Sequence, residues 1–367
     1  MRVKAAVARK PGAPFSLEEL DLDEPRSDEV VVEVAAVGLC HTDVAVRNQW
    51  LPVPLPLVAG HEGAGVVRAV GDAVTSVVPG DRVVMTYWRC GTCPECRGGH
   101  PAYCVQHGPW TTGGGRPDGT NALRDGSGPV HGFFFAQSSF ATHAIATDRN
   151  IVKVGSDVDL TVAAPLGCGA QTGAGTVMNR LCPQVGATLA VFGTGAVGMS
   201  AVMAAHLAGC AQVIAIDVNA ARLALAGRLG ATHTINATSV DDLVGQIRRI
   251  VPRGVDFAID TSARPTVAAQ AFDSLAPRGT LAILGLGPPG TALALDTTRL
   301  LTSGRTVTGV ALGDGVPEQI IPDLLALQGQ GRFPLEELVT TYPLTAINDA
   351  VADTESGKVV KAVLLPS

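Results

Sequence analysis

The stretch that decides the fold runs from residue 188 to residue 217 and reads TLAVFGTGAVGMSAVMAAHLAGCAQVIAID. The apolar run 188–192 predicts a buried strand, and Gly193-Thr-Gly-Ala-Val-Gly198 follows it directly. Residues 199–207 form a helical segment, and the next apolar run ends on Asp217. A strand, a glycine-rich turn, a helix and a second strand ending on an acidic residue are typical of a dinucleotide-binding unit.

The residue types in this unit indicate which nucleotide it binds. Gly193, Gly195 and Gly198 allow a tight turn and a close approach of the backbone to a pyrophosphate, whose charge the helix N-terminus stabilises. Asp217 can hydrogen-bond both ribose hydroxyls and repel a 2'-phosphate, so we expect NAD rather than NADP. The alternative is a glycine turn that binds no nucleotide. Arg222 either borders the adenosine or is a solvated helical side chain.

From about residue 160 the chain alternates buried strands with Ala- and Leu-rich helical segments. Continuous apolar strands belong in a parallel sheet that is covered on both faces. We therefore expect an α/β protein with a doubly wound, six-stranded parallel sheet. The predicted strands are 188–193, 212–218, 231–236, 255–262, 279–287 and 306–313.

The first part of the chain has a different pattern. Short β-type runs such as Glu29–Val34 and Gly65–Val70 are broken by glycines and prolines, which predicts an irregular, mostly β domain. After the nucleotide-binding unit, the amphipathic stretch Pro317–Leu327 leads to a tail that we expect to return to this first domain. The predicted organisation is residues 1–159 as a catalytic domain, 160–313 as the nucleotide-binding domain and 314–367 as the return.

Composition limits the class of protein. A chain of 367 residues is long enough for about two domains, and 46% hydrophobic with 16% charged residues indicates a compact protein. The net charge of -6 gives no basic field for a nucleic acid or an anionic membrane. No stretch reaches the ~20 apolar residues of a membrane span, and the N-terminus lacks a signal-peptide pattern. We therefore expect a cytoplasmic protein.

Four of the eight cysteines lie within fifteen positions, at Cys90, Cys93, Cys96 and Cys104. Cysteines this close together cannot usefully cross-link a chain of this length. Four thiolates complete a tetrahedral zinc shell and leave no position for water, so the spacing predicts a structural zinc site. A redox CxxC pair is the competing interpretation.

A second set of zinc-ligand residue types is scattered along the chain. Its members are Cys40 in CHTD (40–43), His61 in GHEG (60–63) and Cys168 in GCG (167–169). Each alone is typical of buried packing. Together, two thiolates and one imidazole make a zinc site with an open fourth position, as chemistry requires.

With these motifs the chain resembles the zinc-dependent medium-chain alcohol dehydrogenases over essentially its full length. Short segments at 101–104, 137–141, 165–169 and 330–334 are similar to the aryl (benzyl) alcohol dehydrogenase branch. The resemblance implies a GroES-like mostly β catalytic domain with both zinc sites, a Rossmann domain that binds NAD, and a homodimer or homotetramer.

The resemblance also implies roles for single residues. Cys40, His61 and Cys168 would hold a catalytic zinc that acts as a Lewis acid on the substrate oxygen. Thr42 would pass the alcohol proton to the cofactor ribose, although it also fits an ordinary turn. Asp43 would orient His61.

The remaining implied roles lie further from the reacting atoms. Glu62 would assist ligand exchange at zinc, while Thr172 and Val197 would contact the nicotinamide.

Two positions depart from the family pattern. Many relatives complete the proton relay with a histidine where this chain has Ala45, so water or another base is expected there. His41 and Lys361 occupy positions where arginines often hold the pyrophosphate. We expect a weaker or pH-dependent hold on the cofactor, unless His41 is a bystander.

The predicted function is a zinc- and NAD-dependent alcohol dehydrogenase that interconverts primary aryl or allylic alcohols and aldehydes. Trp50, Trp88 and Phe133–Phe135 either line a pocket for such substrates or pack in the core. Alternatives within the enzymes are a thiol-adduct formaldehyde dehydrogenase or a short aliphatic alcohol dehydrogenase. An inactive nucleotide-binding relative and a zinc-ribbon binding protein are the alternatives outside them.

Overall fold

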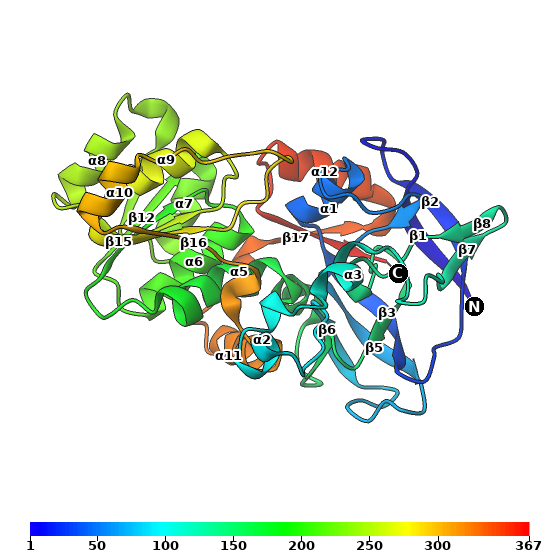
Figure 1. Cartoon of the computed structure of the whole chain (residues 1–367). Coiled ribbons are helices and arrows are strands. Elements are labelled where there is room, and N and C mark those ends of the chain that lie inside the picture. Colours follow the sequence, from blue (N-terminus) through cyan, green and yellow to red (C-terminus); the bar gives the residue numbers. More distant parts are fainter. Residues whose placement is uncertain (367) are drawn as a thin grey trace. The chain divides into compact units, whose positions relative to one another are not determined.

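The computed structural model describes residues 1–366 (Figure 1). Contacts within the chain divide it into two compact units. The first comprises Met1–Cys168, Val316–Gly329 and the chain from Leu335 onwards, and the second comprises Gly169–Gly315 and Gln330–Pro334. The division thus falls at 168/169 and 315/316, near the predicted boundaries at 159/160 and 313/314, which stay predictions.

The second unit contains the predicted six-stranded sheet, and all its strands are parallel. Their order across the sheet, β13-β12-β11-β14-β15-β16, is that of a doubly wound dinucleotide-binding fold, which confirms the predicted fold class. The strands are β11 (Thr188–Phe192), β12 (Gln212–Asp217), β13 (His233–Asn236), β14 (Val255–Asp260), β15 (Leu275–Ile283) and β16 (Thr306–Gly309).

Two strand predictions were inaccurate. Strand β15 begins at Leu275 rather than at Gly279, because Leu275 pairs with Val255 across an irregularity in the register, and it ends at Ile283 rather than at Gly287. Strand β16 ends at Gly309 rather than at residue 313. The following residues Leu312–Asp314 form a short 3-10 turn in which all three have positive φ, a conformation no strand contains.

Helices cover the parallel strands, as Figure 1 shows for α6 to α9. Helix α6 (Ala196–Leu207) is buried from Gly198 to Ala205, which explains why its sequence is apolar on every side. The remaining helices there are α7 (Ala220–Arg228), α8 (Leu243–Ile250) and α9 (Pro265–Ser274). Residues of α8 and α9 form one core cluster with Phe192 and Ile214 of the sheet. Burial on both faces is what the continuous apolar strands predicted.

The first unit is mostly β, with a five-stranded sheet of order β4-β1-β2-β7-β8 and a seven-stranded sheet of order β10-β6-β5-β3-β18-β17, in which β9 also pairs with β3. Strand β18 pairs antiparallel with β3, so the end of the chain completes a sheet that begins near residue 29. The strands are β1 (Arg2–Ala8), β2 (Ser16–Leu22), β3 (Glu29–Gly38), β4 (Leu57–Val58), β5 (Gly63–Val70), β6 (Arg82–Met85), β7 (Leu123–Asp125), β8 (Gly128–Val130), β9 (His143–Thr147), β10 (Ile151–Val154), β17 (Val339–Pro343) and β18 (Lys361–Leu365).

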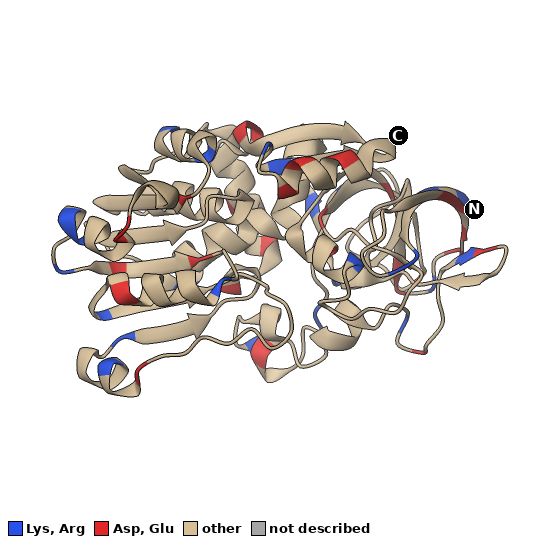
Figure 2. Cartoon of the chain, turned by 90° about the horizontal axis from the view of Figure 1, so that it is seen from above, with Lys and Arg blue, Asp and Glu red and all other residues tan. Residues whose placement is uncertain are grey.

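Charged residues of both signs are interspersed along the ribbon (Figure 2). None of the helices between residues 1 and 366 is both long and apolar enough to cross a membrane.

An ion pair between Glu29 and Arg116 lies in the interior of the first unit. Arg116 donates from Nε to Glu29 Oε1 at 2.7 Å and from Nη2 to Oε2 at 2.8 Å, and a third bond of 3.2 Å reaches Asp23. Both side chains of the Glu29–Arg116 pair are almost fully buried. Because Glu29 begins β3, this pair ties the 113–122 loop to the central strand of the larger sheet.

Removing Glu29 leaves the buried guanidinium of Arg116 with the less buried Asp23, 3.2 Å away, as its ion-pair partner. We expect Glu29→Ala to lower the free energy of unfolding by about 3 kcal/mol, measured by urea denaturation. The control is the double variant Glu29→Leu/Arg116→Met, which removes both charges and keeps apolar volume, and should recover most of the loss. Equal losses in the single and double variants would contradict this account.

Candidate metal centres and nucleotide site

Four side chains from separate parts of the first unit meet at one point. Ligand atoms of Cys40, His61, Glu62 and Cys168 all lie within 4.8 Å of one another. Cys40 stands between β3 and helix α1 (His41–Arg47), His61 and Glu62 directly precede β5, and Cys168 follows the 3-10 turn Ala164–Gly167. The structure thus brings together the three predicted ligands of the open zinc site.

Asp43 ties these segments to one another. Its fully buried carboxylate accepts hydrogen bonds from Cys40 N at 3.0 Å and Gly60 N at 3.0 Å, and contacts His61 Nδ1 at 2.8 Å. Asp43 can do this because it lies in the first turn of α1, where its side chain reaches back to the residue that precedes the helix.

The remaining nitrogen of His61 is suited to binding a metal. The imidazole is fully buried, and Nε2 has no hydrogen-bond partner among the described residues. A buried polar atom without a partner is costly unless something absent from the chain satisfies it. If Nδ1 donates to Asp43, Nε2 presents its lone pair toward the two sulfurs, as in zinc-bound histidines.

The two sulfurs interact with each other. The hydrogen bond from Cys168 lowers the pKa of Cys40 well below its ordinary value, and the same bond raises the pKa of Cys168. At least one thiolate is therefore favoured in the cluster, and a thiolate is the form that binds zinc. Two sulfurs and an unpartnered imidazole nitrogen fit a zinc ion with one open position.

Glu62 and Lys361 form a buried ion pair beside these residues. Lys361 Nζ lies 2.5 Å from Glu62 Oε2 and donates to Leu39 O at 3.0 Å. Burial raises the pKa of Glu62 to about 7, against the opposing effect of Lys361. A Cβ on Gly38 would lie 2.0 Å from Glu62 Oε2, so only glycine leaves room for this carboxylate. The predicted contact of Lys361 with the pyrophosphate would require the ammonium group to leave these partners.

The aromatic segment 133–135, for which the sequence left a substrate pocket and core packing as alternatives, packs on His61. The Phe135 ring stacks on the imidazole with centroids 4.6 Å apart and planes inclined by 29°, and the Phe134 ring meets it edge-on at 5.4 Å. Phe133, Phe135, Ala136 and Ser138 all have positive φ. Non-glycine residues hold this conformation only when their surroundings impose it.

Two buried amides hold that segment in place. Gln137 Nε2 donates to His61 O at 2.9 Å, and its Oε1 accepts from Gly63 N at 3.1 Å. Asn150 Nδ2 donates to Ala136 O at 3.0 Å. The sequence motif 137–141 drew attention to Gln137, but no pattern in the sequence pointed to Asn150.

The other predicted residues of this region lie as follows. Thr42 is in the first turn of α1, with its Oγ1 3.6 Å from Cys40 Sγ. His41 is exposed, and its ring centroid lies 5.8 Å from that of Trp50. Ala45 is fully buried, so a histidine there would have to displace packed neighbours.

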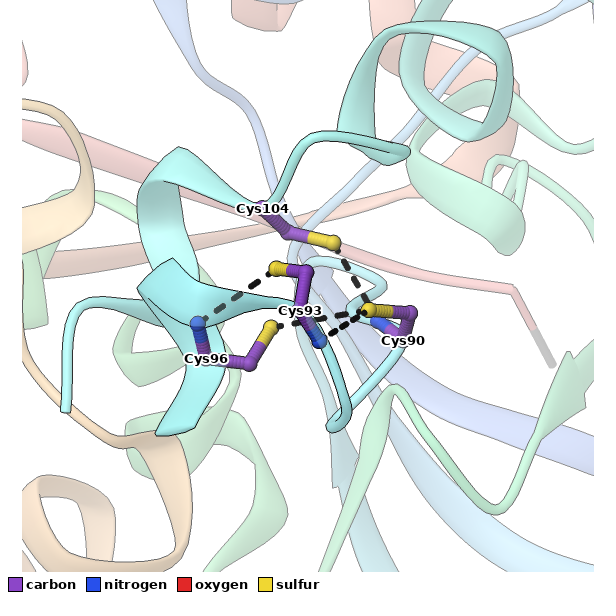
Figure 3. A group of neighbouring side chains, drawn as sticks. All are labelled: Cys90, Cys93, Cys96 and Cys104. Carbon is purple, nitrogen blue, oxygen red and sulfur yellow. Dashed lines mark hydrogen bonds between the residues drawn. The ribbon is translucent and has the colours of Figure 1, made fainter. Parts of the chain in front are cut away.

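The four clustered cysteines form a second group of possible ligands (Figure 3). Cys90 Sγ and Cys96 Sγ are 3.9 Å apart, close to the ~3.8 Å that Zn–S bonds of ~2.3 Å give in a tetrahedron. Backbone N–H groups of Thr92 and Cys93 point at Cys90 Sγ, and that of Cys96 points at Cys93 Sγ.

These N–H contacts favour thiolates and lower the pKa of Cys90 to about 5, Thr92 being the main cause. None of the eight cysteines, all of which the structure describes, forms a disulfide. The stacked rings of Trp88 and Trp110, 4.4 Å apart, belong to the same packed cluster as the cysteines. Four sulfurs at this spacing fit a structural zinc ion.

The glycine-rich turn of the second unit has the form of a dinucleotide site. A Cβ on Gly198 would lie 1.9 Å from Gly193 O, and one on Gly193, whose φ is +92°, would lie 2.4 Å from Thr261 Oγ1. Gly195, by contrast, has no other atom within 4 Å of its Cβ direction, which leaves open space where a pyrophosphate would approach.

A cavity of about 320 Å³ opens beside this turn. Its lining includes Gly193, Gly195, Asp217, Arg222 and Arg264. The structure thus brings four of the predicted nucleotide-site residues to one cavity at the carboxyl ends of β11 and β12, where open α/β sheets bind ligands.

The two predicted nicotinamide contacts come from neighbouring helices of this unit. Thr172 lies on helix α5 (Gly169–Gly175), and Val197 lies in the first turn of α6. The helices approach closely, since a Cβ on Gly173 would lie 2.0 Å from Val197 O.

Comparison with known proteins identifies both halves of the chain. Residues 26–156 match the family model of the alcohol dehydrogenase GroES-like domain, and residues 196–328 match that of the zinc-binding dehydrogenases. Geraniol dehydrogenase of Castellaniella defragrans is 43% identical over 364 residues, which covers 99% of this chain and 97% of that protein.

Solved structures agree over the whole chain. Benzyl alcohol dehydrogenase of Acinetobacter calcoaceticus is 42% identical with a TM-score of 0.96, and both chains are covered completely. An alcohol dehydrogenase zinc-binding domain protein of Burkholderia ambifaria is 51% identical with a TM-score of 0.97, again over both full chains.

Metal analysis of variants tests the two clusters. We expect two zinc ions per chain in the natural protein and one in Cys40→Ala, because the variant removes one of only three proposed protein ligands from that site. Cys182→Ala is the matched control, since Cys182 is exposed and belongs to neither cluster, and it should keep both ions. One zinc ion in both the natural protein and Cys40→Ala would show that Cys40, His61 and Cys168 do not hold a metal.

Proposed function

Because the chain belongs to the zinc-dependent medium-chain alcohol dehydrogenases, we propose that it uses NAD to interconvert primary aryl or allylic alcohols and their aldehydes. We propose two zinc ions per chain, one catalytic at Cys40, His61 and Cys168, and one structural at the four clustered cysteines. A cytoplasmic homodimer or homotetramer completes the proposal, and the half-exposed edge strand β16 supports assembly through the sheet.

One observation carries the proposal. Cys40, His61 and Cys168 converge with their ligand atoms within 4.8 Å, although they lie 21 and 107 positions apart along the chain. A zinc site that only stabilised the fold would have four protein ligands and no open position, as the other cysteine cluster would provide. Three ligands and a neighbouring carboxylate leave room for a substrate oxygen.

The chain's own residues would prepare this site for the reaction. When bound, zinc supplies a Lewis acid for the alcohol oxygen and NAD accepts the hydride. Asp43 fixes the ring of His61 and leaves Nε2 as the ligand atom. Thr42, two positions after Cys40, would accept the alcohol proton and pass it on. Lys361 neutralises Glu62, so the buried site carries no excess negative charge from that carboxylate.

Aromatic side chains beside the site support the proposed substrate class. Phe135 and Phe134 pack on the ligand His61, and Trp50 lies beside His41, which adjoins the ligand Cys40. Phe134 is fully buried and Phe135 nearly so. Trp50 is half-buried, and its flat apolar surface favours benzyl or allylic groups over short alkyl groups. The names of the similar proteins, a geraniol and a benzyl alcohol dehydrogenase, support the same class.

Asp217 supports NAD as the cofactor. Its carboxylate lies at the end of β12 in the cavity beside the glycine-rich turn, where it can accept hydrogen bonds from ribose hydroxyls. A 2'-phosphate at that place would meet a like charge.

A panel of alcohols tests the proposed reaction. We expect NADH formation with benzyl alcohol and geraniol at a kcat/KM about 100-fold above that with ethanol, because the larger alcohols have additional apolar groups that contact the protein. S-hydroxymethyl thiols should be poor substrates. A preference for ethanol, or for the thiol adduct, would instead support one of the alternative alcohol dehydrogenases. Absence of NADH with every alcohol would refute the proposal.

Thr42 is tested separately. Replacing its hydroxyl in Thr42→Val should lower kcat by about 100-fold or more, because a positioned proton-transfer group contributes on that order. Thr42→Ser is the matched control and should retain most of the rate. Both variants should keep two zinc ions. Equal rates in the valine and serine variants would show that the hydroxyl carries no proton.

A further inference from the structure

A carboxylate and a threonine meet at the nucleotide cavity in a way that the proposed function does not use. Asp217 Oδ2 accepts two hydrogen bonds from Thr194, one from its N–H at 2.6 Å and one from its hydroxyl at 2.8 Å. Asp217 Oδ1 accepts from the backbone N–H groups of Val218 at 2.7 Å and Asn219 at 2.9 Å. Hydrogen bonds from the protein therefore fix the positions of both carboxylate oxygens of Asp217.

Thr194 is itself firmly placed. It is fully buried and stands between Gly193 and Gly195 in the turn that faces the cavity. The turn is fixed from its other side, because Thr261 Oγ1 donates toward Phe192 O and Gly193 O, each at 3.1 Å. The Thr194 hydroxyl donates to Asp217 from a side chain, so a single substitution can remove this bond and leave the bonds from the backbone intact.

The charges of the cavity make the position of this carboxylate decisive. Arg222 and Arg264 line the same cavity as Asp217, so two cations face one anion. Two guanidinium groups attract a phosphate. Exclusion of a 2'-phosphate therefore depends on Asp217 remaining in place instead of turning toward either arginine.

We propose that Thr194 is a specificity-determining residue. Its hydroxyl holds Asp217 in the orientation in which the carboxylate accepts a hydrogen bond from the ribose 2'-hydroxyl and repels a 2'-phosphate. This inference rests on the proposed function in one respect, namely that the cavity binds NAD. Thr194 acts through Asp217 and is thus a positioning residue. The preference for NAD over NADP then depends on Thr194 and Asp217 together, and not on Asp217 alone.

Calorimetric titration of the zinc-loaded full chain with NAD and NADP tests the proposal without turnover. Thr194→Val keeps the shape of the side chain and removes the hydroxyl. We expect it to lower the ratio of the Kd for NADP to the Kd for NAD about tenfold. Thr194→Ser should restore it. Titration with 2'-deoxy-NAD should show almost no difference between the natural protein and Thr194→Val, because the group that Asp217 would bind is missing.

A matched control lies at the other end of the same strand. Thr188 begins β11 and donates to Asp256 Oδ2 from its N–H at 3.0 Å and from its hydroxyl at 2.8 Å. Thr188→Val removes the same kind of bond outside the lining of the nucleotide cavity, so it should leave the ratio of NADP to NAD affinity unchanged.

The outcomes separate the inference from the proposed function. Equal weakening of NAD and NADP in Thr194→Val, or a serine variant that behaves like the valine variant, would overturn the role of the hydroxyl while leaving NAD as the cofactor. A natural protein that binds neither nucleotide would overturn the proposed cofactor and this inference with it.

Discussion

The buried carboxylate of Asp43 is the constraint on which the candidate active site depends. It accepts hydrogen bonds from the backbone at Cys40 and Gly60 and contacts the ring of His61, so it joins two segments that are 17 positions apart. An ionised group is kept in an apolar interior only when such partners satisfy it. The same bonds that make the burial of Asp43 tolerable therefore fix the positions of two candidate ligands, Cys40 and His61.

Segments packed around the metal-ligand cluster are also fixed by hydrogen bonds and an ion pair between distant parts of the chain. The segment 133–138 holds an unfavourable backbone conformation because Gln137 and Asn150 anchor its backbone and neighbouring strands. That conformation presents the Phe135 ring to the imidazole of His61. Strand β18 brings Lys361 to Glu62 by pairing with β3, so the end of the chain neutralises a charge that an earlier loop buries.

The nucleotide-binding unit depends on a tight turn that is held from both sides. Thr261 fixes the carbonyl groups at the end of β11, while Thr194 reaches across to Asp217 at the end of β12. Adjacent parallel strands end at the same edge of a sheet, which is why residues 23 positions apart meet there. We therefore attribute the proposed preference for NAD to the orientation of Asp217 as well as to its charge.

The sequence by itself determined the family, the doubly wound sheet and the residue types that can bind metal. These properties follow from local patterns: apolar runs, glycine spacing and clustered cysteines are legible over a few residues. It misplaced the start of β15 and the end of β16, because pairing with Val255 and a run of positive φ at 312–314 outweighed local turn signals.

Only the tertiary structure decided which side chains touch. The stacking of Phe135 on His61, the partners of Lys361 and the hold of Thr194 on Asp217 are contacts between segments distant along the chain. Such contacts depend on how strands pair and loops close, and no periodicity within a segment encodes them.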